Sequence, residues 1–198
     1  MALIERTEGL TIPGALANRA TTDPERPYIV FKDRVLTYGQ VEIRADALAA
    51  SFAHLGVKTG DRIALVLPAW PEFVLAAFAA AKVGAAIVPI NPLITTSELR
   101  YMLRQTQAIA AVTVETFEGT DYLSKLDDLL ESLPDLNHLY TVGEEDLWYD
   151  DRVFQFEDAL SAGEGRDYEG SDIDSATHPF AILYTSGTTG KPKGVEVS

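Results

Sequence analysis

Residues 62–90 read RIALVLPAWPEFVLAAFAAAKVGAAIVPI and determine the expected fold. The apolar run at the beginning, residues 62–67, and the run at the end, residues 86–90, have the length of buried strands. Between them, Pro71 suits the first position of a helix and Gly84 suits its C-terminal cap. The stretch therefore predicts a strand, a helix and a second strand that runs parallel to the first.

The same alternation continues on both sides of this stretch. Helices are predicted where apolar residues recur every three or four positions, and strands where short apolar runs end at turn residues. These patterns predict strands at residues 109–114, 138–142 and 180–184, and a β-hairpin at residues 28–37. They predict helices at residues 39–55 and 71–83 and around Leu123 to Leu133. A further helix should begin at Thr95, which forms a capping box with Glu98. Such an order is typical of an α/β fold, a parallel-rich doubly wound sheet with helices on both faces.

Length and composition are those of an ordinary globular protein. The 198 residues are 46% hydrophobic, which suffices for a substantial core, and include no cysteine. The net charge of −14 argues against nucleic acid as a partner, because the phosphates would be repelled. Glu5 and Glu8 argue against a secretory signal, and the longest apolar run, residues 73–81, is too short to span a bilayer. We therefore expect a cytoplasmic protein without a membrane span.

Acidic residues are concentrated between residues 143 and 175. This segment holds twelve acidic residues and two arginines, a net charge of −10, which leaves −4 for the rest of the chain. Blocks of like charge are usually solvated, so we interpret residues 143–178 as an acidic connecting segment with a short helix near 153–160. Residues 1–142 would then form an α/β subdomain with an N-terminal hairpin, and residues 179–198 a separate final part. A metal or partner site is the less favoured alternative, and adaptation to high internal salt is a further hypothesis.

Residues 184–195 read YTSGTTGKPKGV and carry the residue types that hold a polyphosphate. Glycines let backbone N–H groups approach an anion, hydroxyls donate hydrogen bonds, and lysines supply positive charge. The patterns G-x-x-x-x-G-K-[ST] and G-x-G-x-x-G are both absent, and Pro192 argues against a helix that begins at Lys191. We therefore expect a strand ending at Tyr184, a phosphate-binding loop and a second strand at 193–197. On composition alone, a plain surface turn is the alternative.

The loop and two further stretches resemble one enzyme superfamily. Residues 35–73, VLTYGQVEIRADALAASFAHLGVKTGDRIALVLPAWPEF, are similar to the opening segment of acyl-CoA synthetases, and residues 80–103, AAKVGAAIVPINPLITTSELRYML, to the segment that follows it. With YTSGTTGKPKGV, they resemble the acyl-adenylate-forming (AMP-binding) superfamily, in its acyl-CoA synthetase or fatty-acid–CoA ligase branch. The three motifs occur in the same order as in the family, from about Leu10 to Val195. The resemblance implies the N-terminal portion of the large domain of an adenylate-forming enzyme.

The resemblance also implies an acid–thiol ligase reaction. In this family a carboxylic acid attacks the α-phosphate of magnesium-bound ATP, which gives an acyl adenylate and pyrophosphate, and the thiol of coenzyme A then displaces AMP. ATP, magnesium and coenzyme A would be the cofactors and a small-molecule carboxylic acid the other partner, while a homodimer is left open. By resemblance, the nucleotide would be held by Thr185, Ser186, Gly187, Thr188, Thr189, Gly190 and Lys193, with Thr185 also a magnesium contact.

Two details favour a CoA ligase over a peptide synthetase. GTTG at residues 187–190 and INP at residues 90–92 resemble acyl-CoA and aryl-CoA ligases, and a fatty acid is the expected substrate. The family's catalytic lysine and its adenine, coenzyme A and acyl-pocket residues would follow Ser198. We therefore expect no catalytic residue in this chain and no ligase activity from these residues alone. An aryl-CoA ligase or other acyl-adenylating enzyme, a non-catalytic nucleotide-binding module, and a structural domain with a vestigial loop remain alternatives.

Overall fold

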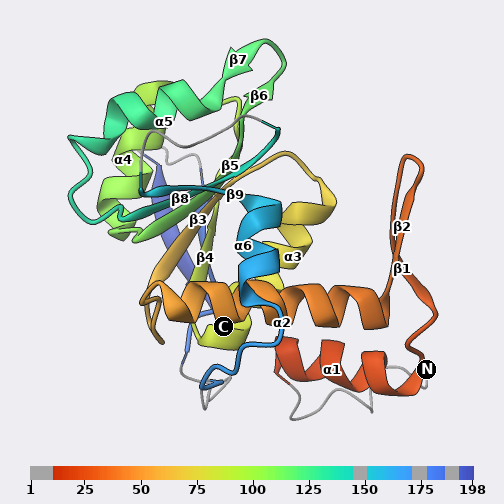
Figure 1. The fold of residues 1–198 in the computed structure, drawn as a ribbon. Coiled ribbons are helices and arrows are strands. Elements are labelled where there is room, and N and C mark those ends of the chain that lie inside the picture. Colours follow the sequence, from red (N-terminus) through yellow and green to blue (C-terminus); the bar gives the residue numbers. More distant parts are fainter. Residues whose placement is uncertain (1–10, 145–150, 171–177, 186–191) are drawn as a thin grey trace.

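The computed structural model describes residues 11–144, 151–170, 178–185 and 192–198. Within these ranges, a seven-stranded sheet has the strand order β11-β10-β4-β3-β5-β8-β9 (Figure 1). Its strands are β3 (Arg62–Val66), β4 (Ala86–Pro89), β5 (Ala110–Val114), β8 (His138–Val142), β9 (Val153–Gln155), β10 (Ala181–Thr185) and β11 (Lys193–Val197). The helices are α1 (Ile12–Thr22), α2 (Tyr38–His54), α3 (Pro71–Val83), α4 (Thr96–Thr106), α5 (Tyr122–Leu130) and α6 (Phe156–Gly163). Two hairpins, β1 (Pro27–Phe31) with β2 (Arg34–Thr37) and β6 (Thr116–Phe117) with β7 (Thr120–Asp121), lie outside the sheet.

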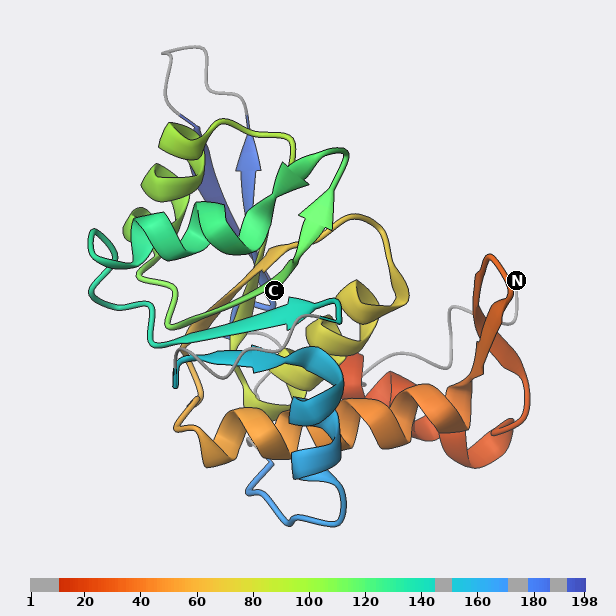
Figure 2. The same ribbon diagram turned by 45° about the horizontal axis from the view of Figure 1, so that its top comes forward.

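The sheet is parallel except at one edge and is covered on both faces, so the predicted α/β fold class is confirmed. Only β11 runs antiparallel to its neighbour, β10. Helices α4 and α5 lie on one face of the sheet, and α2, α3 and α6 lie on the other (Figures 1 and 2). This division follows from right-handed crossovers, because β3 connects to β4 in one direction while β4 connects to β5 in the opposite direction. All five residues of β5 are buried, as expected for a central strand between two helical layers.

The boundaries of several helices are determined by local sequence. Helix α3 begins at Pro71 and ends at Val83, and its C-cap Gly84 has a left-handed φ of 77°, which favours a residue without a side chain. Helix α4 opens with the predicted capping box, in which Thr95 accepts a hydrogen bond from the backbone of Glu98 and the Glu98 side chain accepts one from the backbone of Thr95. The predictions for these two helix starts are therefore confirmed.

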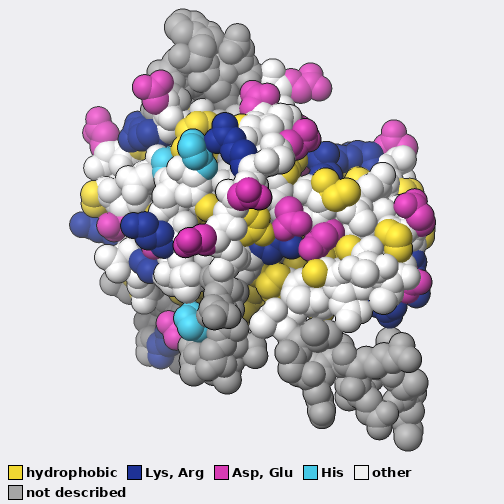
Figure 3. Space-filling view, turned by 60° about the horizontal axis from the view of Figure 1, so that its bottom comes forward, with side chains coloured by type: hydrophobic (Ala, Val, Ile, Leu, Met, Phe, Trp, Pro, Cys, Tyr) yellow, Lys and Arg dark blue, Asp and Glu magenta, His cyan; other side chains and the backbone are white. Residues whose placement is uncertain are grey.

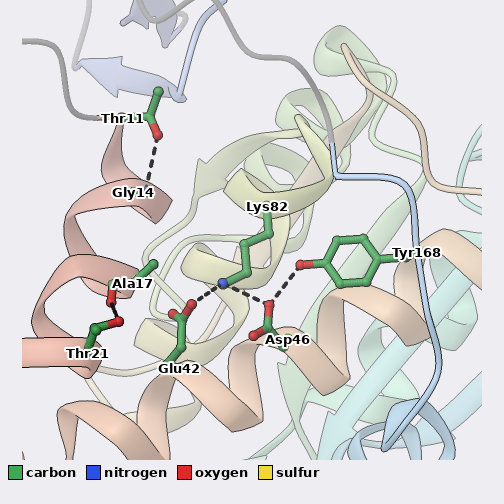
Figure 4. Close-up of polar contacts among 8 residues, drawn as sticks. All are labelled: Thr11, Gly14, Ala17, Thr21, Glu42, Asp46, Lys82 and Tyr168. Carbon is green, nitrogen blue, oxygen red and sulfur yellow. Dashed lines mark hydrogen bonds and ion pairs between the residues drawn. The ribbon is translucent and has the colours of Figure 1, made fainter. Parts of the chain in front are cut away.

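A polar cluster crosses the interface between α2 and α3 (Figure 4). Lys82, in the last turn of α3, points toward Glu42 and Asp46 on α2. The hydroxyl of Tyr168, which follows α6, donates a hydrogen bond of 2.8 Å to Oδ1 of Asp46. The segment after α6 is thereby tied to α2.

One helix and three strands were not predicted. Helix α1 precedes the hairpin, and its N-cap residue Thr11 accepts a hydrogen bond from the backbone of Gly14 (Figure 4). Hairpin β6–β7 precedes α5. Strand β9 occupies residues for which a helix was expected, so the helix begins only at Phe156 and ends at Gly163. β9 pairs with β8 at the edge of the sheet, and the proposed division of the chain after residues 142 and 178 stays a prediction.

No helix within the described ranges is both long enough and apolar enough to cross a bilayer.

Candidate functional site

The candidate site is centred on the stem of the predicted phosphate-binding loop. We call the stem the four residues Tyr184, Thr185, Lys193 and Gly194. Tyr184 pairs with Gly194, and Thr185 pairs with Lys193, at the end of the antiparallel ladder of β10 and β11. The strand expected to end at Tyr184 extends one residue further, and the strand predicted at residues 193–197 is confirmed.

The middle of the loop lies outside the described residues. This applies to Ser186, Gly187, Thr188, Thr189 and Gly190, all expected to hold phosphate, and to Lys191. Only Thr185 and Lys193 among the predicted site residues have a described position. The ladder brings these two residues directly opposite each other.

The stem lies where ligands of parallel sheets usually bind. β10 runs parallel to β4, with Ala181 opposite Ile87, so the loop leaves from the carboxyl end of a strand inside the sheet. The side chains of Thr185 and Lys193 are exposed. Within the described part of the chain, the ammonium of Lys193 has no ion-pair partner. Lys193 can therefore receive an anionic group without giving up an existing ion pair.

Tyr184 lies on the other face of this two-stranded ladder, because side chains alternate along a strand. Its hydroxyl donates a hydrogen bond of 2.9 Å to Oε1 of Gln105 on α4. Burial, with a smaller contribution from Tyr101, raises the pKa of the Tyr184 hydroxyl to about 12. Tyr184 therefore remains a hydrogen-bond donor at neutral pH.

Gly194 provides space for the side chain of Ile182 and lies against the ring of Tyr184. A Cβ atom at this position would lie 3.0 Å from Cγ2 of Ile182 and 3.4 Å from Cζ of Tyr184. The glycine thus lets the aromatic ring lie against the backbone of β11. The sequence alone had assigned the glycines of residues 184–195 only the role of letting backbone N–H groups approach an anion.

Among the described acidic residues of 143–175, Glu144, Glu157 and Asp158 lie beside β9 at the opposite edge of the sheet, whereas Asp167 and Glu169 lie next to α2 and the end of α3. β9 and β10 are separated by five strand spacings, which corresponds to roughly 24 Å. This separation exceeds the screening length of about 8 Å at physiological ionic strength. Acidic and basic side chains are interspersed on the face that carries α1 and α2 (Figure 3). The net negative charge of the chain is therefore compatible with an anion at the stem.

A second polar arrangement at the carboxyl edge has a structural role. The carboxylate of Glu115, just after β5, accepts hydrogen bonds from Nε2 of Gln155 at 2.7 Å and from the backbone of Glu144 at 2.9 Å. A side chain at Gly143 would collide with this carboxylate. These contacts join β9 to the ends of β5 and β8. No sequence pattern had pointed to Glu115, because its partners are 29 and 40 residues away.

The family to which this chain belongs follows from a match over most of its length. Residues 16–198 match the family described as AMP-binding enzyme. The chain is therefore a member of the AMP-binding enzyme family, as its three motifs had indicated.

Individual relatives in this family include CoA ligases. The crotonobetaine/carnitine–CoA ligase of Salmonella typhimurium (strain LT2) is 34% identical over 165 residues, which cover 83% of this chain and 31% of that protein. The acetyl-coenzyme A synthetase of Streptomyces coelicolor is 31% identical over 169 residues, which cover 82% of this chain and 26% of that protein. Both proteins are thus more than three times as long as the matched segment.

Solved structures confirm the fold. The anthranilate CoA ligase AuaEII, in complex with anthranoyl-AMP, superimposes with a TM-score of 0.82 at 25% identity, over 93% of this chain and 34% of the other. The chain therefore spans between about a quarter and a third of the length of these three relatives.

Proposed function

We propose that this chain is the N-terminal part of an ATP-dependent acyl-CoA synthetase. The reaction would activate a carboxylic acid as an acyl adenylate and transfer the acyl group to coenzyme A. The observation that carries the proposal is the exposed pair of Thr185 and Lys193, held opposite each other at the carboxyl end of β10. CoA ligases among the relatives support the same reaction class.

In the first step of the proposed reaction, a carboxylate oxygen forms a bond to the α-phosphorus of ATP. The bond from that phosphorus to the bridging oxygen breaks, and pyrophosphate leaves with the electron pair. Thr185 and Lys193, with the loop residues Ser186, Gly187, Thr188, Thr189 and Gly190, would hold the β- and γ-phosphates. Hydrogen bonds and positive charge there stabilise the negative charge that develops on the departing pyrophosphate.

In the second step, the sulfur of coenzyme A attacks the acyl carbon. The bond between that carbon and the phosphate oxygen breaks, and AMP leaves with the electron pair while the thiol proton is released. We assign no residue of this chain to this step.

Thr185 fits the proposed magnesium contact by its chemistry. Magnesium prefers oxygen ligands, and the Thr185 hydroxyl is such a ligand on an exposed strand end. Within the described ranges, no group of three or more His, Asp or Glu residues could hold a metal ion by itself. The phosphates and water would supply further oxygen ligands to magnesium, which would neutralise part of the phosphate charge.

For the acid substrate, we propose a fatty acid. Support comes from GTTG at residues 187–190 and INP at residues 90–92, which resemble acyl-CoA and aryl-CoA ligases. The named relatives act on acids of different kinds, namely crotonobetaine or carnitine, acetate and anthranilate. An aromatic acid is therefore the alternative substrate class.

We further propose a cytoplasmic location for the protein. Whether it forms a homodimer would be tested by sedimentation of the full-length protein.

Exchange of labelled pyrophosphate into ATP by the full-length protein tests the proposed reaction. A panel of fatty, aromatic and short-chain acids should reveal one class that supports exchange. Lys193→Ala should lower the exchange rate by at least tenfold, because a phosphate ligand is lost. Lys58→Ala is the matched control, since Lys58 is exposed in the turn before β3 and should leave exchange unchanged.

Two results would contradict the proposal. The absence of exchange with every acid, together with calorimetric binding of ATP, would indicate a non-catalytic nucleotide-binding module. Unchanged exchange in Lys193→Ala would show that this lysine is not part of the site.

A further inference from the structure

We propose that Tyr184 and Gln105 are a positioning pair, which fixes the stem of the phosphate-binding loop against helix α4. The inference rests on the proposed function, because it specifies how the groups that hold the phosphates are kept in place. Neither residue would touch the nucleotide.

The first argument is the position of Tyr184 in the ladder. Tyr184 immediately precedes Thr185, and its pairing partner Gly194 immediately follows Lys193. Since side chains alternate along strands, Thr185 and Lys193 point away from the face on which Tyr184 lies. Tyr184 can therefore contact both strands of the stem on one face of the ladder and leave the opposite face, which carries Thr185 and Lys193, open to the phosphates.

The second argument is the contact of the ring with β11. The Cβ position of Gly194 lies 3.4 Å from Cζ and 3.6 Å from the hydroxyl oxygen of Tyr184. The ring thus spans from its own strand across the neighbouring strand. A displacement of Tyr184 would move the backbone on both sides of the loop.

The third argument is the anchor at the far end of the side chain. The hydroxyl of Tyr184 donates to Oε1 of Gln105 at 2.9 Å, and Gln105 belongs to the last turn of α4. Arg62, at the start of β3, donates to the carbonyl of Thr106 at 2.6 Å and to that of Gln107 at 3.1 Å. These bonds satisfy carbonyl groups at the end of the helix and fix it to the centre of the sheet.

A loop stem built in this way is held from two directions. The ladder aligns β10 with β11, and the hydrogen bond from Tyr184 to Gln105 sets the position of both strands relative to α4. The raised pKa of Tyr184 agrees with this role, because a protonated hydroxyl is needed to donate the bond.

The test uses the full-length protein and the variants Tyr184→Phe, Gln105→Leu and the double variant. Tyr184→Phe keeps the ring against Gly194 and removes only the hydroxyl. Each single variant should raise the KM for MgATP by about fivefold, as expected for the loss of one hydrogen bond. The KM for the carboxylic acid should not change, and the double variant should resemble each single variant because both lose the same bond.

A second measurement is independent of activity. Hydrogen exchange of the backbone amides in residues 181–197, followed by mass spectrometry, should be faster by at least fivefold in Tyr184→Phe and in Gln105→Leu. Exchange in residues 110–114 of β5 is the internal control and should remain as in the wild type. Thermal unfolding of each variant checks that the fold is retained.

The proposal is overturned if both single variants keep the wild-type KM for MgATP or if their effects add in the double variant. An equal rise in the KM for the acid would also overturn it, because it would indicate general damage. If the wild type catalyses no pyrophosphate exchange, the proposed function fails, and amide exchange alone decides the inference. Unchanged amide exchange in both variants then rejects the positioning pair, and faster exchange confined to residues 181–197 supports it.

Discussion

Nζ of Lys82 lies 2.8 Å from Oε1 of Glu42, and the two side chains are only 8% and 17% exposed. The same ammonium lies 2.8 Å from Oδ1 of Asp46, so one positive charge serves two carboxylates. Removing one charge of such an enclosed pair lowers the free energy of unfolding more than removing one charge of a surface ion pair, because the remaining charge stays desolvated.

Lys82→Met should therefore destabilise the protein by about 3 kcal/mol, mainly because the enclosed carboxylate of Glu42 would lose its counter-charge, while Asp46, which is 47% exposed, is screened by solvent and contributes less. Denaturant unfolding monitored by circular dichroism gives the free energy directly. Lys58→Met is the control and should change stability by less than about 0.5 kcal/mol, as expected at an exposed position. A loss of that small size in Lys82→Met as well would show that the cluster contributes little.

Tyr168 should make stability depend on pH in the alkaline range. Burial raises its pKa, and the hydrogen bond and negative charge of Asp46 and the charge of Glu42 raise it further. The folded state therefore keeps the hydroxyl proton at a pH where the unfolded chain loses it. The resulting stabilisation is complete below about pH 10, the pKa of an unperturbed tyrosine, and decreases as the pH rises above that value.

Replacing Tyr168 by Phe should reduce this alkaline decrease in stability. Unfolding in urea at pH 8, 10 and 11 would compare the variant with the wild type. Other tyrosines with raised pKa values, such as Tyr140 and Tyr184, keep part of the pH dependence in both proteins. If the free energy of unfolding decreased equally with pH in the two proteins, the environment of Tyr168 would not favour its protonated form.

Gly194→Val should displace the side chain of Ile182, because even a Cβ atom at this position lies 3.0 Å from its Cγ2, and the two added methyl groups should crowd the ring of Tyr184, whose Cζ lies 3.4 Å from that Cβ position. We expect a loss of about 1 kcal/mol in stability from overpacking and a higher KM for MgATP in the full-length protein. Glu196→Val on the same strand is the matched control, since Glu196 is exposed and lies opposite Ile182. If both variants bind MgATP equally well, the small size of residue 194 is not important for the stem.

Salt should stabilise this chain. At a net charge of −14, repulsion among carboxylates opposes the folded state, and dissolved ions screen this repulsion. The unfolding midpoint should therefore be higher in molar potassium chloride than at low ionic strength. Equal midpoints would also argue against the hypothesis of adaptation to high internal salt.

Much of the fold could be predicted because its signals are local. Pro71 and Gly84 delimit α3, and the apolar runs of β3, β5 and β8 are long enough to be recognised alone. Helix α1 was missed because it contains Pro13 and Gly14 and buries only Leu16, so it has no clear apolar periodicity. Strand β9 has three residues and depends on its pairing with β8, which no local pattern records.

The candidate site could be predicted only in part, for a related reason. Thr185 and Lys193 belong to a recognisable motif, and their pairing follows from the two strands on either side of it. Gln105 is an ordinary polar residue on an amphipathic helix, and its partner Tyr184 is 79 residues away. Neither this contact nor the close approach of Gly194 to Ile182 can be read from a single sequence.

The position of β10 beside β4 has a consequence for how the protein is made. The two strands are neighbours in the sheet, although about ninety residues separate them in the chain. Contacts between such distant segments form slowly, because the chain between them must first lose conformational freedom. On the ribosome, β3, β4, β5 and β8 emerge well before β10. We therefore expect the stem of the proposed nucleotide-binding loop to assemble only after β3, β4, β5 and β8 have emerged, so that a nascent chain could not bind ATP there before these strands are in place.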